Sequence, residues 1–194
     1  MYFNIFSSVS AVYKVCYDKT CSYFSSANVT DSKERLFNEL SSLSQYWTFI
    51  DTPTHIIDNI FIGSAYNAAN YNSLSENNFG LIINMTHDLS NHYTSEYIYK
   101  NFPINDNDEE NIDIYLDTAY DYIEEYNKNT TKNILVHCYM GKSRSASIVI
   151  YYLIKKYNYT LDDAIKYIKD KRNIVNPNVN FVMQLKEHDC SSPV

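Results

Sequence analysis

The sequence predicts an α/β fold in which a central, mostly parallel β-sheet is flanked by helices. Short, almost wholly apolar runs, LIINMT at 81–86 and NILVHC at 133–138, are typical of buried strands. Segments of about 10 to 15 residues with apolar side chains at helical spacing alternate with these runs. The length of 194 residues is sufficient for one domain with a sizeable core.

The N-terminal part is expected to be an extension of that domain. Residues 1–50 are assigned to the extension and residues 51–194 to the main domain. Its beginning is rich in Ser and Tyr without periodicity, so no element is predicted there. A helix is expected near 31–45, because Asp31 can cap it, Glu34 occupies the capping-box position and apolar residues follow at helical spacing.

The first half of the main domain is expected to hold strands and one short helix. HIIDNIFIGS, residues 55–64, predicts a strand pair that ends at Gly63. Residues 65–80 predict a short helix closed by Gly80, since a helix C-cap often needs positive φ. The strand LIINMT follows, and NFPIND at 101–106 predicts another short strand that leads into an acidic loop.

The second half is expected to be largely helical around one strand. Apolar positions from Ile112 to Tyr126 predict a helix of about four turns. The strand NILVHC comes next, followed by a strongly apolar helix at 145–157. Thr160 is expected to cap a further helix, and Pro177 to open the last one, because Pro is favoured in a first helical turn.

Composition and charge exclude several classes of function. The net charge is -7 and no Lys/Arg cluster is present, so nucleic acid is not expected as a partner. No apolar run has the roughly 18 residues that a membrane span needs, and the N-terminus lacks the basic region of a signal peptide. The four cysteines fit neither a disulfide framework nor a zinc site, which predicts a reducing, cytoplasmic location.

The segment from Cys138 to Arg144 is the candidate site. It joins a predicted strand to a predicted helix, where open α/β sheets bind ligands. Backbone N–H groups and the helix dipole favour an anion there, and Gly141 lets the backbone curl closely around it. The same field favours the thiolate form of Cys138. Arg144 offers a planar fork for two phosphate oxygens.

These groups together predict a phosphate-ester hydrolase that works through a cysteinyl-phosphate. A Cys-x5-Arg pair alone is a weak motif, but HCxxGxSRS between a strand and a helix is specific. The string resembles the signature of the protein tyrosine phosphatase superfamily, and GKSRS resembles its dual-specificity branch. The resemblance covers residues 55–189, with FPINDNDEENI similar to the general-acid loop and NPNVNFVMQL to the final helix. It implies a protein tyrosine phosphatase-like fold of the dual-specificity type.

The resemblance also implies roles for single residues. A leaving group needs a proton, and the family's general acid lies about 32 residues before the cysteine, which indicates Asp106, with Asp108 as the alternative. The hydroxyl of Ser145 is expected to assist departure of the thiolate and to cap the helix. A buried His137 is expected to orient Cys138. The implied phosphate-binding loop consists of Cys138, Tyr139, Met140, Gly141, Lys142, Ser143 and Arg144.

Supporting residues and cofactors follow from the same resemblance. Three asparagines, Asn84, Asn178 and Asn180, occupy positions from which family members brace the loop by hydrogen bonds. No metal and no cofactor are expected, because the mechanism needs none. The other histidines lack metal-ligand spacing; they are His55, His87, His92 and His188.

The predicted function is hydrolysis of phosphotyrosine and phosphoserine or phosphothreonine in a phosphorylated protein substrate. Two alternatives stay open. A phosphoinositide or other non-protein phosphatase is one, since Lys142 occupies a loop position at which phosphoinositide phosphatases also carry a lysine. A phosphate-binding pseudophosphatase is the other, although the presence of Cys138, Arg144 and Asp106 argues against it. The sequence predicts neither the physiological substrate nor the oligomeric state.

Overall fold

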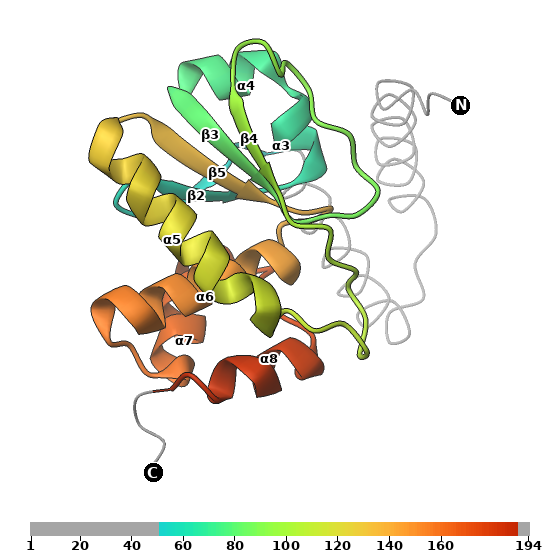
Figure 1. The fold of residues 1–194 in the computed structure, drawn as a ribbon, viewed down its shortest axis with the longest axis vertical. Helices are drawn as coiled ribbons and strands as arrows, with labels where there is room; N and C mark the ends of the chain where they lie inside the picture. The colour runs from blue at the N-terminus through green and yellow to red at the C-terminus, as the bar shows by residue number, and fades with distance from the viewer. Residues whose placement is uncertain (1–50, 190–194) are drawn as a thin grey trace, which may run out of the picture. The chain divides into compact units, whose positions relative to one another are not determined.

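One five-stranded sheet forms the centre of the protein. The computed structural model describes residues 51–189. The strand order is β1-β2-β5-β3-β4. The first two strands form an antiparallel hairpin, and the pairs β2–β5, β5–β3 and β3–β4 are parallel (Figure 1). The strands span Thr54–Ile57, Ile60–Gly63, Phe79–Asn84, Ile98–Asn101 and Asn133–His137, from β1 to β5. The mostly parallel sheet is as predicted.

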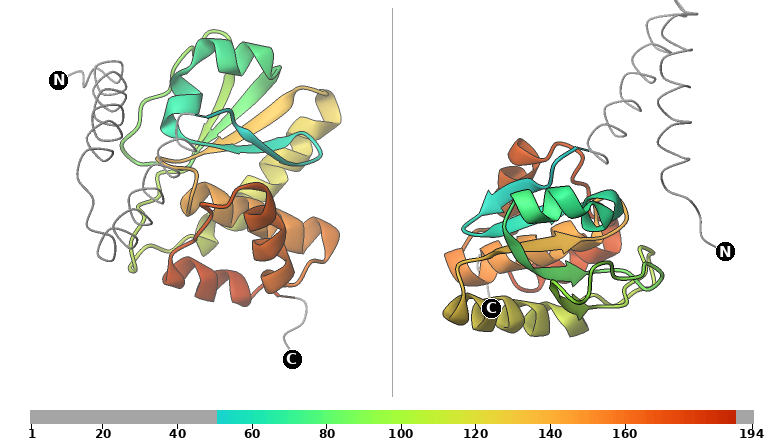
Figure 2. Two further views of the ribbon diagram at one scale, coloured as in Figure 1. Left: turned by 180° about the vertical axis from the view of Figure 1, so that it is seen from behind. Right: turned by 90° about the horizontal axis from the view of Figure 1, so that it is seen from above.

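Helices cover both faces of this sheet. The short helices α3 and α4 lie on one side, and α5 to α8 lie on the other (Figures 1 and 2). Their bounds, from α3 to α8, are Ala65–Ala69, Tyr71–Glu76, Asp113–Asn129, Arg144–Tyr157, Leu161–Lys171 and Val179–Lys186. The predicted alternation of strands and helices is therefore confirmed within the described part of the chain.

The central strands are apolar because both of their faces are buried. Ile82 of β3 and Leu135 of β5 pack with Leu74 of α4 in a small cluster. Their neighbours Ile83 and Val136 belong to the large core on the opposite face, beneath α5 to α8. Alternate side chains of a strand point to opposite faces, so a strand between two helical layers must be apolar throughout.

Helix α6 runs through the large core. Ten of its residues, from Ser145 to Ile154, are buried. The helix ends at Asn158, which adopts the left-handed conformation (φ 55°) that Asn tolerates better than most residues. Because α6 and β5 are both held by the core, the short segment between them has two rigid ends.

The prediction that Gly80 closes a helix is wrong. The expected helix is two helices, separated at Asn70, whose side chain caps α4. Gly80 lies inside β3, and Asn78 adopts the positive φ (49°) before the strand. A Cβ at position 80 would lie 2.3 Å from the hydroxyl of Tyr126, so a larger residue there would require that side chain to move.

The strand expected at 101–106 is displaced. Strand β4 occupies Ile98–Asn101, and residues 102–106 form a loop. The apolar residues that suggested a strand, Phe102 and Ile104, are buried as loop residues. Along residues 51–189 no helix is long and apolar enough to cross a membrane. The predicted extension at 1–50 and its helix near 31–45 lie outside the described residues.

Two predicted helix starts differ in outcome. Thr160 caps α7 as predicted, since its side-chain oxygen accepts a hydrogen bond from the Asp163 N–H (3.1 Å). Pro177 precedes the last helix instead of opening it. Asn178 is the N-cap, and its side-chain oxygen accepts from the Phe181 N–H (2.8 Å). This asparagine also reaches the candidate site.

Candidate active site

The loop between β5 and α6 lies at the centre of one edge of the sheet. Strand β5 ends at His137, with β2 and β3 parallel on either side of it. Cys138 is the first residue beyond the strand, and α6 begins at Arg144. The loop therefore lies at the carboxyl ends of three parallel strands, the position predicted for ligand binding.

The carbonyl groups of this loop are held from outside. The Tyr139 carbonyl accepts a hydrogen bond from the Ala65 N–H (3.0 Å), and the Lys142 carbonyl accepts from the Asn176 N–H (2.9 Å). In a trans peptide the N–H points away from the C=O. These contacts consequently turn the next N–H groups toward the inside of the loop, where an anion would lie.

Arg172 holds the two carbonyls between them. Its guanidinium donates from Nη2 to the Met140 carbonyl and from Nε to the Gly141 carbonyl, each at 2.9 Å. Its Nη1 donates to Thr54 Oγ1 at 3.0 Å. The chain carries three arginines among its 16 basic residues. The scarcity of Arg in a Lys-rich sequence is a signal that could have pointed to this position.

Gly141 has the conformation that the predicted loop requires. Its φ is +69°, and a Cβ there would lie 2.6 Å from the Gly63 carbonyl oxygen and 2.8 Å from Arg172 Nη2. The left-handed conformation and the close approach to β2 both exclude a larger side chain. The glycine is thus needed to close the loop against the end of the neighbouring strand.

Cys138 and Ser145 meet inside the loop. Cys138 is 2% exposed, and its Sγ lies 3.3 Å from Ser145 Oγ. This contact is the one that the predicted role of Ser145 requires. The prediction that Ser145 also caps the helix is wrong: α6 starts one residue earlier, with Ser143 at the N-cap position and no side-chain cap bond.

His137 is buried directly before the cysteine. Its Nδ1 lies 3.4 Å from the Cys138 carbonyl oxygen, to which it donates. Burial lowers the pKa of His137 to about 4, although the bond to the carbonyl acts in the opposite direction. The ring is neutral at neutral pH. This geometry suits an orienting residue, the part predicted for it.

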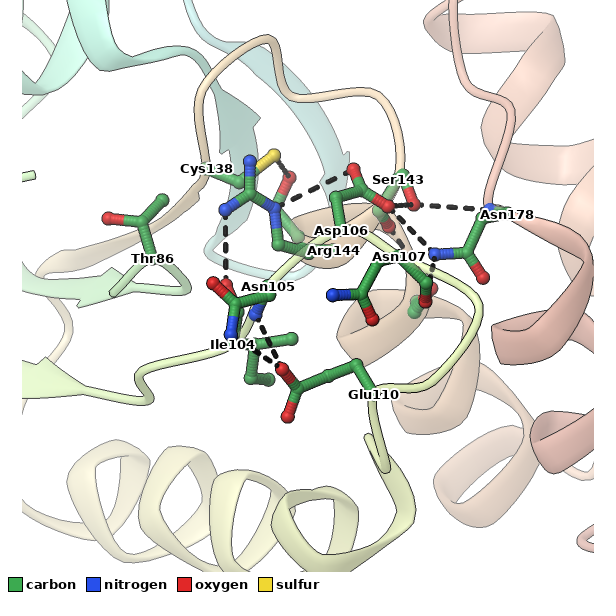
Figure 3. A network of polar contacts seen from close by, with 12 residues as sticks. Thr86, Ile104, Asn105, Asp106, Asn107, Glu110, Cys138, Ser143, Arg144 and Asn178 are labelled. Carbon is green, nitrogen blue, oxygen red and sulfur yellow. Dashed lines mark hydrogen bonds and ion pairs between the residues drawn. The ribbon is translucent and has the colours of Figure 1, made fainter. Parts of the chain in front are cut away.

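Arg144 lies across the loop from the general-acid segment. Its side chain is 12% exposed, and Nη1 donates to the Ile104 carbonyl at 3.1 Å. Its Nε lies 3.6 Å from Asp106 Oδ2, an ion-pair distance, but is buried without a hydrogen-bond partner (Figure 3). Buried donors in native proteins normally have a partner, and phosphate oxygens are suitable acceptors for this one.

Asp106 is the acidic residue that reaches the loop. Its Oδ1 accepts from Ser143 Oγ (2.7 Å) and from Asn178 Nδ2 (2.8 Å), and Asn178 N–H donates to Ser143 Oγ (3.1 Å; Figure 3). The alternative Asp108 is exposed like Asp106 but makes none of these contacts. The structure therefore brings together Asp106 and the loop across 32 residues of sequence.

The three supporting asparagines have different partners. Asn178 joins Ser143 of the loop to Asp106, as described above. Asn84 does not brace the loop as predicted: its side chain bonds to Thr86, Leu89 and Asn91 in the segment that follows β3.

Asn180 supports the acidic loop instead. Its Nδ2 donates to the Glu110 carbonyl (2.7 Å), and Glu110 in turn accepts from the Asn105 N–H (2.9 Å). Among the side chains of the implied phosphate-binding loop, Tyr139 is 53% exposed, while Met140 and Lys142 are half-buried.

Fold and site together define a class of protein. The model of the family described as dual specificity phosphatase, catalytic domain, matches residues 60–190. The chain belongs to this family of the cysteine-based protein tyrosine phosphatase superfamily.

Individual proteins with similar sequences support this family membership. The human protein phosphatase Slingshot homolog 2 is 35% identical over 161 residues, 83% of this chain and 11% of its own length. Dual specificity protein phosphatase 1 of Arabidopsis thaliana is 34% identical over 144 residues, 74% of this chain and 72% of its own length. The chain spans 11% to 22% of the length of the Slingshot relatives that it matches.

Solved structures of similar fold agree with this membership. The crystal structure of DUSP15 has a TM-score of 0.68 and 26% identity, covering 72% of this chain and 88% of its own. The crystal structure of human DUSP28 has a TM-score of 0.67 and covers 72% of this chain and 93% of its own. At 22% identity, the latter similarity concerns the fold alone.

Proposed function

We propose that this chain is a protein phosphatase that hydrolyses phosphotyrosine and phosphoserine or phosphothreonine through a cysteinyl-phosphate. The observation that carries the proposal is the convergence of Cys138, Ser145, Arg144 and Asp106 at one loop, with Cys138 Sγ 3.3 Å from Ser145 Oγ. Family membership and the names of the relatives support the protein substrate and the dual specificity.

In the first step the Cys138 thiolate attacks phosphorus. An S–P bond forms while the bond from phosphorus to the ester oxygen breaks. Loop N–H groups and Arg144 hold the equatorial phosphate oxygens. Protonated Asp106 gives its proton to the leaving oxygen, so that the dephosphorylated side chain departs as a neutral hydroxyl.

In the second step water releases the phosphate. The Asp106 carboxylate takes a proton from water, whose oxygen attacks phosphorus while the S–P bond breaks. The Ser145 hydroxyl donates a hydrogen bond to the departing Cys138 thiolate, for which its position next to Sγ is suitable. Inorganic phosphate leaves, and the enzyme returns with Asp106 protonated and Cys138 ionised. No metal or cofactor takes part in either step.

The cellular setting belongs to the same proposal. A nucleophilic thiolate must stay reduced, which fits an intracellular, reducing compartment such as the cytoplasm. The catalytic domain is assigned to residues 51–194, and residues 1–50 to an extension.

The test is turnover by the wild-type chain and by Cys138→Ser, with chelator present. A phosphotyrosine peptide, a phosphothreonine peptide and a soluble phosphoinositide serve as parallel substrates. Cys138→Ser is expected to lower peptide hydrolysis to the uncatalysed background while phosphate still binds, because the hydroxyl is a far weaker nucleophile than the thiolate. Cys190→Ser is the matched control and should retain activity. Peptide hydrolysis that survives Cys138→Ser, or activity confined to the phosphoinositide, would contradict the proposal.

A further inference from the structure

Arg172 is a buried cation at the end of α7. It follows the last residue of the helix and is 2% exposed. Its side chain is the largest of the fully buried side chains among the described residues. Burying a charged group is costly unless hydrogen bonds and opposite charge compensate for the lost hydration. The burial of this guanidinium therefore indicates that the groups it contacts need its hydrogen bonds or its charge.

That place is the outer side of the phosphate-binding loop. Nε and Nη2 bond to the carbonyls of Gly141 and Met140, two consecutive peptide groups, while Nη1 bonds to Thr54 Oγ1 of β1. The planar fork of Arg can reach two neighbouring carbonyls at once, whereas the single ammonium of Lys is a point donor. The fork thereby ties the middle of the loop to the hairpin at the edge of the sheet.

The consequence for the loop interior follows from peptide geometry. Each trans peptide directs its N–H away from its C=O. With the Met140 and Gly141 carbonyls bonded to Arg172, the N–H groups of Gly141 and Lys142 face the opposite way, toward the anion position. Gly141 could otherwise relax easily, because glycine has the widest choice of backbone conformations.

The charge of Arg172 also acts on the site. Burial lowers its pKa to about 10, while the negative charges of Cys138 and Asp51 act in the opposite direction. The guanidinium accordingly stays protonated at neutral pH. Its positive charge reaches the nucleophile through the buried interior, where charges are poorly screened.

We propose that Arg172 is a positioning residue of the phosphate site, which fixes the peptides of Met140 and Gly141 so that their neighbouring N–H groups bind the transferred phosphoryl group. The inference rests on the proposed function, because it assigns to Arg172 a part in the same reaction. Its part differs from that of Arg144, which in the proposed mechanism binds the phosphate oxygens directly.

The experiment compares Arg172→Met and Arg172→Lys with the control Ile168→Ala, in the full chain. Ile168 is a fully buried residue of the same helix and belongs to the large core. For each variant the Kd of orthovanadate is measured by calorimetry, kcat and KM are measured with a phosphotyrosine peptide, and the Tm is recorded.

The expected result separates positioning from stability. Arg172→Met, which removes the donors and the charge, should raise the vanadate Kd by about tenfold or more and lower kcat. Arg172→Lys should recover part of this loss. Ile168→Ala should lower the Tm but leave the Kd unchanged. If Arg172→Met does not fold, Arg172→Lys is decisive, because the positioning role requires the fork and so a Kd weaker than that of the wild type.

Two outcomes would overturn the proposal in distinguishable ways. If the wild-type chain binds vanadate and hydrolyses the peptide while Arg172→Met or Arg172→Lys binds vanadate as tightly, only the role of Arg172 fails. If the wild-type chain neither binds vanadate nor hydrolyses the peptide, the proposed function fails together with it.

Discussion

At the scale of single residues, the two acidic candidates of the general-acid loop are clearly separated. Both are exposed, but it is Asp106 that accepts hydrogen bonds from Ser143 and Asn178 and lies 3.6 Å from Arg144. The same short sequence therefore contains one carboxyl group that is bonded to the phosphate-binding loop and one that makes none of these contacts. Sequence spacing alone could not separate them, because they differ by two positions.

This difference predicts the effect of removing each acid. Asp106→Asn should slow phosphotyrosine-peptide hydrolysis by about 10²- to 10⁴-fold, the usual contribution of a general acid. An aryl phosphate with a very good leaving group should be affected much less, since its leaving oxygen hardly needs a proton. Steady-state kinetics with both substrates measures this contrast. Asp108→Asn is the control, and the assignment fails if it shows the larger peptide-specific loss.

The roles of other site residues differ in how readily the sequence predicts them. Cys138, Gly141 and Arg144 stand in one short motif, so their roles could be predicted from local chemistry. Arg172 lies 28 positions beyond Arg144, in a segment that resembles an ordinary helix end. Its contact with the loop is made by the packing of α7 against the rest of the fold, which no local pattern encodes.

At the scale of elements, one residue at the start of α8 contributes both to the stability of the helix and to the position of Asp106. Asn178 caps the helix through its side-chain oxygen and holds Asp106 through its side-chain nitrogen. The two functions use different atoms of one amide. Substitutions at this position can consequently separate them.

The prediction concerns Asn178→Ser and Asn178→Ala. Serine still caps a helix well but cannot reach Asp106, so it should lower kcat for a phosphopeptide by about tenfold, the value of one hydrogen bond to a charged group. Alanine should have the same kinetic effect and also reduce the free energy of unfolding by about 1 kcal/mol. Denaturant titration and kinetics of both variants provide the check. A serine variant with wild-type kcat would show that the amide does not orient Asp106.

The elements that were predicted poorly are those defined by their neighbours. Phe102 and Ile104 suggested a strand, but a loop buries them equally well. Gly80 suggested a helix end, but it lies inside β3, where the side chains of Tyr126 and Lys132 approach its backbone closely. An apolar residue indicates burial, and a glycine indicates a close approach of other atoms to the backbone. Strands, helices and loops can all meet either requirement, so these residues do not specify the local structure.

At the scale of the whole molecule, a buried histidine couples stability to pH. Burial lowers the pKa of His137 to about 4 in the folded protein, from an ordinary value of 6.5. Above pH 6.5 both states are neutral, and the full stability is present. As the pH falls toward 4, the unfolded chain binds a proton that the folded protein does not, so stability decreases across this window.

This linkage predicts a loss of up to about 3 kcal/mol between pH 6.5 and 4, from the size of the pKa difference. The free energy of unfolding, measured by denaturant titration at several pH values, tests it. His137→Gln should be less stable near neutral pH but show a shallower decrease on acidification, because the titrating group is gone. Equal slopes for the two proteins would rule out His137 as the source.

The α/β class, the mostly parallel sheet and the nucleophile loop could be predicted from the amino-acid sequence. Apolar runs encode strands buried on both faces, and the chemistry of phosphate transfer needs a thiol, a tight backbone and an arginine close together in the chain. The folded chain was needed to identify the carboxyl group that contacts that loop, the asparagine that braces it and the bonds from Arg172 to its peptides. These contacts join α7, α8 and the segment after β4 to the end of β5, and their geometry arises from packing around the common core.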